Sequence, residues 1–190
     1  MTEQDLLLDC LRRLNSRDLA YMLTGSMASN AWGIPRTTHD LDFVLQLPPS
    51  HVSRFVEAFA STDFFVDEAM IRSAYQPPYQ FNVIHVPSAL KVDFWMLKPN
   101  AFEREMFRRK VKDTWLGETV WMATAEDVVL HKLHWNRLTP SDRQLGDVAG
   151  VVAVQRDRLD KSYLRHWAAR LGVAGELEDA LSGKLRPKRT

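Results

Sequence analysis

The chain has 190 residues, of which 45% are apolar and 26% are charged; 25 lysines and arginines against 24 aspartates and glutamates give a formal net charge of +1. These values are ordinary for one globular domain with a sizeable core, and they argue against a DNA-coating protein, which needs a large excess of cations. The single cysteine, Cys10, excludes a disulfide framework and a cysteine-rich zinc module, and no apolar run approaches the roughly 18 residues of a membrane span. We therefore expect a cytoplasmic protein with no membrane partner and no zinc.

Hydrophobic periodicity predicts alternating helices and strands in the first two thirds of the chain. Leucines at helical spacing indicate the first helix, and alternating residues between proline-containing breaks indicate strands. In chain order we predict helices at 2–16, 27–32 and 52–59, strands at 19–24, 40–47, 80–86 and 90–97, and a hairpin formed by 110–115 and 118–122. The basic residues within 106–112 are predicted to lie on a charged edge strand, with an RNA-facing edge as the alternative.

From Thr124 onward the apolar residues follow a helical period. Thr124 is predicted to cap a helix, because acidic residues follow it in the first turn. Further helices are predicted at 141–155, 160–171 and 176–181. The expected fold class is α/β (α+β), with a mixed β-sheet flanked by helices. We expect a core over 1–122, a helical C-terminal extension packed on it over 123–182, and a mobile basic tail over 183–190.

The near-zero net charge is the sum of two unlike parts of the chain. Acidic residues outnumber basic ones in 1–100, whereas basic residues are in excess in 101–190. The second part therefore suggests a polyanionic partner, and an RNA-binding module is one alternative function for the chain.

Three aspartates stand on predicted strands that are otherwise apolar. Asp40 and Asp42 are two residues apart, so strand alternation predicts that they share a face while Leu41 points into the core. Asp93 is a lone carboxylate on the later strand, and the three would converge if the two strands are neighbours. Carboxylates placed close together repel unless a cation lies between them, and a hard divalent cation such as Mg²⁺ prefers such oxygens.

Gly25 and Ser26 stand where a predicted strand ends and a helix follows. Backbone N–H groups, a positive helix end and one hydroxyl at such a turn can bind a phosphate. A phosphate site together with a carboxylate cluster supplies the groups needed for metal-assisted phosphoryl or nucleotidyl transfer.

The ordered set of Gly25-Ser26, a short helix, Asp40-x-Asp42 and the later Asp93 resembles the nucleotidyltransferase fold of the DNA polymerase beta superfamily. With Arg36 and Thr38 included, it is most similar to small bacterial nucleotidyltransferases of the abortive-infection toxin type. The segment from Ala125 to Val148 resembles that group's Glu-Asp…Lys…Arg…Asp helical motif, and the match covers most of 17–155 in order. Four residues inserted between Arg137 and Asp142 depart from this motif, so the roles of Arg137, Asp142 and Asp147 stay open.

The resemblance implies roles for individual residues. Asp40, Asp42 and Asp93 would be the catalytic, metal-binding residues for Mg²⁺ or Mn²⁺, with Asp93 also helping to deprotonate the attacking hydroxyl. The nucleotide's phosphates would be bound by a second set of residues, Gly25, Ser26, Arg36 and Lys132.

Some of these residues also have ordinary structural explanations. Lys91 could pair with Asp93 on the same strand face, Arg36 could form a salt bridge that holds the loop before Asp40, and Lys132 could simply be solvated on its helix.

The aromatic residues and histidines also have ordinary explanations. His131 and His134 have a spacing that can bind zinc, but no third ligand is near them in the sequence, and we interpret them as packing or surface residues. Trp32 and Trp95 lie close to the predicted site residues in the sequence, so one of them could contact a base.

We hypothesise a Mg²⁺-dependent nucleotidyltransferase that moves a nucleoside monophosphate from a nucleoside triphosphate to a hydroxyl. The acceptor could be an RNA end such as that of tRNA, a protein side chain or a small molecule. The resemblance also suggests the toxin of a toxin–antitoxin or phage-defence pair, with an antitoxin partner. The alternative is a catalytically idle relative that binds nucleotides or another protein. The sequence leaves the nucleotide, the acceptor and the oligomeric state open.

Overall fold

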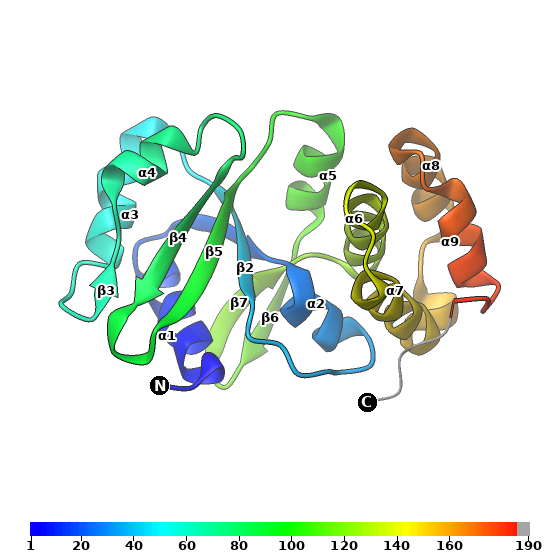
Figure 1. Ribbon diagram of the computed structural model, residues 1–190, viewed down its shortest axis with the longest axis horizontal. Helices are drawn as coiled ribbons and strands as arrows, with labels where there is room; N and C mark the ends of the chain where they lie inside the picture. The colour runs from blue at the N-terminus through cyan, green and yellow to red at the C-terminus, as the bar shows by residue number, and fades with distance from the viewer. Residues whose placement is uncertain (186–190) are drawn as a thin grey trace. The chain divides into compact units, whose positions relative to one another are not determined.

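The computed structural model describes residues 1–185 and divides them into two compact units (Figure 1). Unit 1 contains residues 1–24 and 39–122, and unit 2 contains residues 25–38 and the chain from Ala123 onward. Of the basic tail expected at 183–190, residues 186–190 lie outside the described part of the chain. Lys184, which belongs to the same predicted tail, forms a 2.7 Å ion pair with Asp179.

Unit 1 is built on a seven-stranded mixed sheet with the order β3-β4-β5-β2-β1-β7-β6. The β2–β5 and β1–β7 pairs are parallel, and the other pairs are antiparallel. The strands are β1 (Ala20–Leu23), β2 (Leu41–Gln46), β3 (Phe64–Phe65), β4 (Gln80–His85), β5 (Leu90–Met96), β6 (Val111–Trp115) and β7 (Glu118–Met122). The predicted strands and hairpin are therefore present, to within one or two residues at each end.

One face of this sheet carries an aromatic core. Phe43 of β2 and Phe94 of β5 are fully buried, and their rings stack with centroids 5.4 Å apart. Phe55 of α3 (Val52–Ala58) meets Phe94 edge to face at 5.1 Å. Complete burial of a side chain of this size stabilises the fold by about 2–3 kcal/mol. This cluster keeps β2 and β5 adjacent.

The remaining helices of unit 1 include two that the sequence pattern did not indicate. The N-terminal helix α1 (Glu3–Ser16) is confirmed, whereas α4 (Glu68–Ser73) and α5 (Ala101–Arg109) are additional. The prediction of an edge strand over 106–112 is wrong for 106–109, which belong to α5, whereas Lys112 does lie on the edge strand β6. Asn100 caps the N-terminus of α5, because its side-chain oxygen accepts a 2.9 Å hydrogen bond from the Glu103 N–H.

Unit 2 is helical. Its helices are α2 (Gly25–Trp32), α6 (Ala125–Leu138), α7 (Asp142–Gln155), α8 (Lys161–Leu171) and α9 (Ala174–Leu181). The predicted cap of α6 is confirmed, since Thr124 Oγ1 accepts from the Asp127 N–H at 3.2 Å and donates to the Asp127 carboxylate at 2.7 Å. No helix within residues 1–185 is both long enough and apolar enough to cross a membrane.

The position of α2 departs from the expected 1–122 core, because this helix belongs to unit 2. A Cβ at Gly33 would lie 2.7 Å from the backbone nitrogen of Val151, so only glycine allows this approach of the chain to α7. Trp32 Nε1 donates to the Ala123 carbonyl at 2.8 Å, and Gln155 Nε2 donates to the Trp32 carbonyl at 2.6 Å. These contacts join residues far apart in the sequence, and local periodicity cannot reveal them.

Candidate functional site

The parallel pairing of β2 with β5 places Asp42 directly beside Asp93. Neighbouring strands are separated by about 4.8 Å, and directly paired residues project to the same face. The two carboxylates therefore share the face opposite to Phe43 and Phe94. Asp40 lies one residue before β2 and is exposed, so strand alternation accounts for the placement of Asp42 but not for that of Asp40.

Asp93 is held by two neighbours. Lys91 Nζ donates to both carboxylate oxygens, at 2.9 Å and 2.8 Å, and Asn82 Nδ2 donates to Oδ1 at 2.5 Å. The pairing of Lys91 with Asp93 considered from the sequence is therefore present. Asn82 was missed, because only the antiparallel β4–β5 register brings it opposite Asp93.

Asp42 is bonded at both its side chain and its backbone. Trp95 Nε1 donates to Asp42 Oδ1 at 3.4 Å, and the Thr24 N–H donates to the Asp42 carbonyl at 2.9 Å. The second bond brings the end of β1 level with Asp42. The Thr24 hydroxyl is buried there and has no hydrogen-bond partner within the described residues.

The charges of the neighbouring carboxylates act on Lys91. The hydrogen bond to Asp93 and the charges of Asp93, Asp40 and Asp42 raise the pKa of Lys91, against the opposing effect of partial burial. Carboxylate oxygens are also the ligands that Mg²⁺ and Mn²⁺ take, so the donor chemistry fits such an ion. Within residues 1–185, however, no three His, Cys, Asp or Glu side chains are grouped so that they could hold one metal ion together.

A second ionic cluster lies within unit 2, around Asp147 of α7. Arg36 binds the Asp147 carboxylate through Nε at 2.7 Å and Nη2 at 2.8 Å, and Lys132 Nζ lies 2.7 Å from Oδ2. The Lys132 and Asp147 side chains are only 6% and 5% exposed. Burial alone would raise the pKa of Asp147, but the hydrogen bond from Arg36 and the charge of Lys132 outweigh it and lower that pKa.

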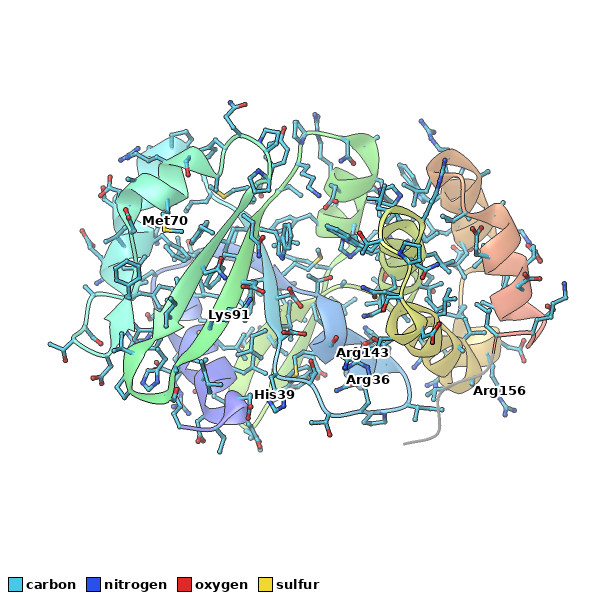
Figure 2. The ribbon with its side chains drawn as sticks, viewed as in Figure 1. Arg36, His39, Met70, Lys91, Arg143 and Arg156 are labelled. Atoms are coloured by element: carbon cyan, nitrogen blue, oxygen red, sulfur yellow. The ribbon has the colours of Figure 1, made fainter. Side chains whose placement is uncertain are left out.

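The cluster brings together three of the predicted phosphate-binding residues. Arg36 Nη2 donates to Ser26 Oγ at 2.8 Å, and Gln144 Oε1 accepts from Lys132 Nζ at 3.1 Å (Figure 2 labels Arg36). The salt-bridge alternative for Arg36 is therefore present, while the alternative of a solvated Lys132 is wrong because that lysine is buried. Asp147, whose role the motif left open, is the centre of the cluster.

Gly25 begins α2 with a φ of +63°, a backbone conformation that favours glycine over other residues. This agrees with the strand-to-helix turn expected at Gly25-Ser26, although the helix begins two residues earlier than predicted. Ser26 is buried in the first turn of α2.

Other residues considered from the sequence have structural contacts. Arg137 Nη1 donates to the Leu171 carbonyl at 2.8 Å, which ties α6 to the end of α8. His131 Nε2 accepts from Trp135 Nε1 at 3.0 Å. The indole N–H of Trp32 is bonded to the Ala123 carbonyl.

No protein-family model matches the sequence, and no curated protein is similar to it. Solved structures do share its fold. ANT(2'')-Ia in complex with adenylyl-2''-tobramycin has a TM-score of 0.60 at 12% identity, over 88% of this chain and 95% of that one. An antigenic nucleotidyltransferase-like protein from Paracoccidioides brasiliensis has a TM-score of 0.53 at 15% identity, over 98% and 94%. The chain thus has the nucleotidyltransferase fold, which confirms the expected fold class. Neither likeness identifies a toxin-type subfamily.

Proposed function

We propose that this protein is a Mg²⁺-dependent nucleotidyltransferase that moves a nucleoside monophosphate from a nucleoside triphosphate to a hydroxyl. The observation that carries the proposal is the register of β2 and β5, which places Asp42 and Asp93 side by side on one face of a nucleotidyltransferase-type sheet. The aromatic core on the other face supports this spacing. The presence of all three aspartates argues against the catalytically idle alternative.

In this proposal Asp40, Asp42 and Asp93 hold the divalent cation, Mg²⁺ or Mn²⁺. The bound cation would neutralise charge on the triphosphate and on the departing pyrophosphate. A carboxylate oxygen of Asp93 accepts the proton of the acceptor hydroxyl. The hydroxyl oxygen then bonds to the α-phosphorus as the bond from that phosphorus to pyrophosphate breaks.

The phosphates of the nucleotide are assigned to residues of unit 2. Gly25 and Ser26 offer backbone N–H groups at the start of α2, where the helix dipole favours an anion. Arg36 and Lys132 would add two cationic side chains, which their contacts with Asp147 hold together in one cluster. A triphosphate would meet both a helix end and cationic groups among these residues.

The acceptor is proposed to be a small molecule with free hydroxyls. ANT(2'')-Ia, which shares the fold, was solved with an adenylylated aminoglycoside. An RNA end or a protein side chain is the competing acceptor, and the basic excess beyond residue 100 favours RNA among these two. A toxin role, with an antitoxin partner, would appear as growth arrest that needs Asp42 when the protein is expressed in bacteria.

The test is a transfer assay with four α-labelled nucleoside triphosphates, Mg²⁺, and three acceptor pools: aminoglycosides, total tRNA and protein. Asp42→Ala should lose roughly 1,000-fold in transfer, because a metal ligand supplies several kcal/mol of charge stabilisation. Asp63→Ala is the matched control, since Asp63 is an exposed aspartate of the same unit and should keep full transfer. Equal transfer by wild type and Asp42→Ala would refute the metal assignment.

A further inference from the structure

Lys91 stands two residues before Asp93 on β5, so strand alternation places both side chains on the same face of the sheet (Figure 2 labels Lys91). Its ammonium contacts both oxygens of the Asp93 carboxylate, at 2.9 Å and 2.8 Å. The two side chains differ in exposure, since 54% of Lys91 is accessible and only 12% of Asp93. The lysine is thus the member of the pair that can swing into solvent, whereas the carboxylate is confined.

The lone pairs of Asp93 are largely engaged. A carboxylate has about four lone-pair sites, and Asp93 accepts three hydrogen bonds, two from Lys91 and one from Asn82. A hard divalent cation must take its ligands from these same oxygens. A cation held by both oxygens of Asp93 would therefore have to displace at least one of these hydrogen bonds, and the ammonium of Lys91 is the accessible donor.

Lys91 also compensates for more than one carboxylate. Asp42 is paired directly with Asp93 across the β2–β5 ladder, so a second carboxylate lies on the face that Lys91 occupies. Without this lysine, the carboxylates of the strand face would lose a positive charge that lies among them, and their mutual repulsion would increase.

We propose that Lys91 is a positioning residue that acts as a built-in counter-cation: it holds Asp93 in the metal-free protein and is displaced from Asp93 when a divalent cation binds. This inference rests on the proposed function, because it takes Asp93 as a metal ligand. It is consistent with the absence, within residues 1–185, of three His, Cys, Asp or Glu side chains grouped to hold one metal ion. Metal binding is weakened by the contact that has to be broken.

The proposal is tested by titrating the full-length protein with Mn²⁺ in the absence of nucleotide and measuring free Mn²⁺ by electron paramagnetic resonance. Lys91→Met removes the charge and keeps an apolar stem, and it should bind Mn²⁺ about 10-fold more tightly, because a positive charge that repels the ion is removed. Lys91→Arg restores a cation and should return the affinity to within about threefold of wild type. Lys112→Met, an exposed lysine on β6, is the matched control and should leave the affinity unchanged.

The outcomes separate this inference from the proposed function. Tighter binding by Lys91→Met with recovery in Lys91→Arg supports the inference, as does binding seen only in Lys91→Met. Equal or weaker binding by Lys91→Met, or equally tight binding by Lys91→Arg, overturns it while the metal assignment stands. If neither wild type nor Lys91→Met binds Mn²⁺ in a way that Asp42→Ala abolishes, both the inference and the metal assignment are overturned.

Urea unfolding with and without Mn²⁺ distinguishes the proposed role of Lys91 from a purely structural one. In the presence of EDTA, Lys91→Met should unfold at a lower urea concentration than wild type, because its carboxylates repel one another. Saturating Mn²⁺ should remove most of that difference. A difference that persists unchanged in Mn²⁺ would mean that Lys91 serves only the stability of the fold, which overturns the inference.

Discussion

Both units pair a lysine with an aspartate, but the two pairs are built in opposite ways. In unit 1, Lys91 is half-exposed and one cation faces several carboxylates. In unit 2, Lys132 is buried and two cations share one carboxylate, that of Asp147. In the first pair the lysine is accessible to solvent, whereas in the second both partners are buried. Breaking the second pair should therefore cost more stability than breaking the first.

Of the variants that test this difference between the two units, we expect the largest effect from removing the charge of Asp147. Asp147→Asn should lower the free energy of unfolding by about 3 kcal/mol, because it leaves Arg36 and Lys132 without their shared counter-ion in a buried place. Urea unfolding at neutral pH measures this loss. Asp157→Asn is the control, since its ion pair with Lys161 is at the surface and is worth less than about 1 kcal/mol. Equal losses of unfolding free energy in the two variants would show that burial does not increase the cost of removing this charge.

The pH dependence of stability follows from the same aspartate. The folded protein lowers the pKa of Asp147 from its ordinary value of 3.8, so the carboxylate binds a proton less readily when folded than when unfolded. Its contribution is therefore complete above 3.8 and is lost as the pH falls through the lower, folded value. Wild type should lose more stability than Asp147→Asn over this acid range, and parallel curves for the two proteins would contradict the prediction.

Gly33→Ala tests the close packing of the end of α2 against α7 within unit 2. The added Cβ would lie 2.7 Å from the Val151 nitrogen, so α2 or α7 must shift, at a cost of about 2 kcal/mol in the free energy of unfolding. Gly175→Ala in α9 is the matched control, because nothing lies within 4 Å of its Cβ, and it should be neutral or slightly stabilising. Denaturant unfolding of both variants measures this difference. If Gly33→Ala is as stable as wild type, the chain at position 33 does not pack tightly against α7.

The smallest effect concerns the buried hydroxyl at the end of β1. Thr24→Val keeps the shape and removes a polar group that has no partner within the described residues, so it should raise the free energy of unfolding by about 1 kcal/mol. Thr114→Val, at an exposed position of β6, should change stability by less than about 0.5 kcal/mol. If Thr24→Val is instead less stable than wild type, its hydroxyl is satisfied in the folded protein.

Local patterns were enough to predict most of the elements of the fold. Alternation located β2 and β5, and the cap at Thr124 located α6, because these signals depend on residues close together in the chain. The helices α4 and α5 were not predicted, since α4 spans fewer than two turns and the basic residues at the end of α5 do not by themselves distinguish a helix from an edge strand.

The candidate site could be predicted only in part. The aspartates stood out because each is a charge on an apolar strand, and the β2–β5 pairing confirms that Asp42 and Asp93 are neighbours. Their catalytic role stays a prediction. Asn82 and Asp147 could not be assigned, because one depends on the register of an antiparallel pair and the other on how helices far apart in the sequence pack.

The stacking of Phe43 on Phe94 has a consequence for chemistry as well as for stability. These two rings and the two carboxylates lie on opposite faces of the same adjacent strands, whose backbone hydrogen bonds set the spacing of both pairs. What the rings oppose is a slip in register. A slip of β5 by one residue against β2 would turn Asp93 into the aromatic core and Phe94 out of it, so the packing of the rings keeps the two carboxylates on one face.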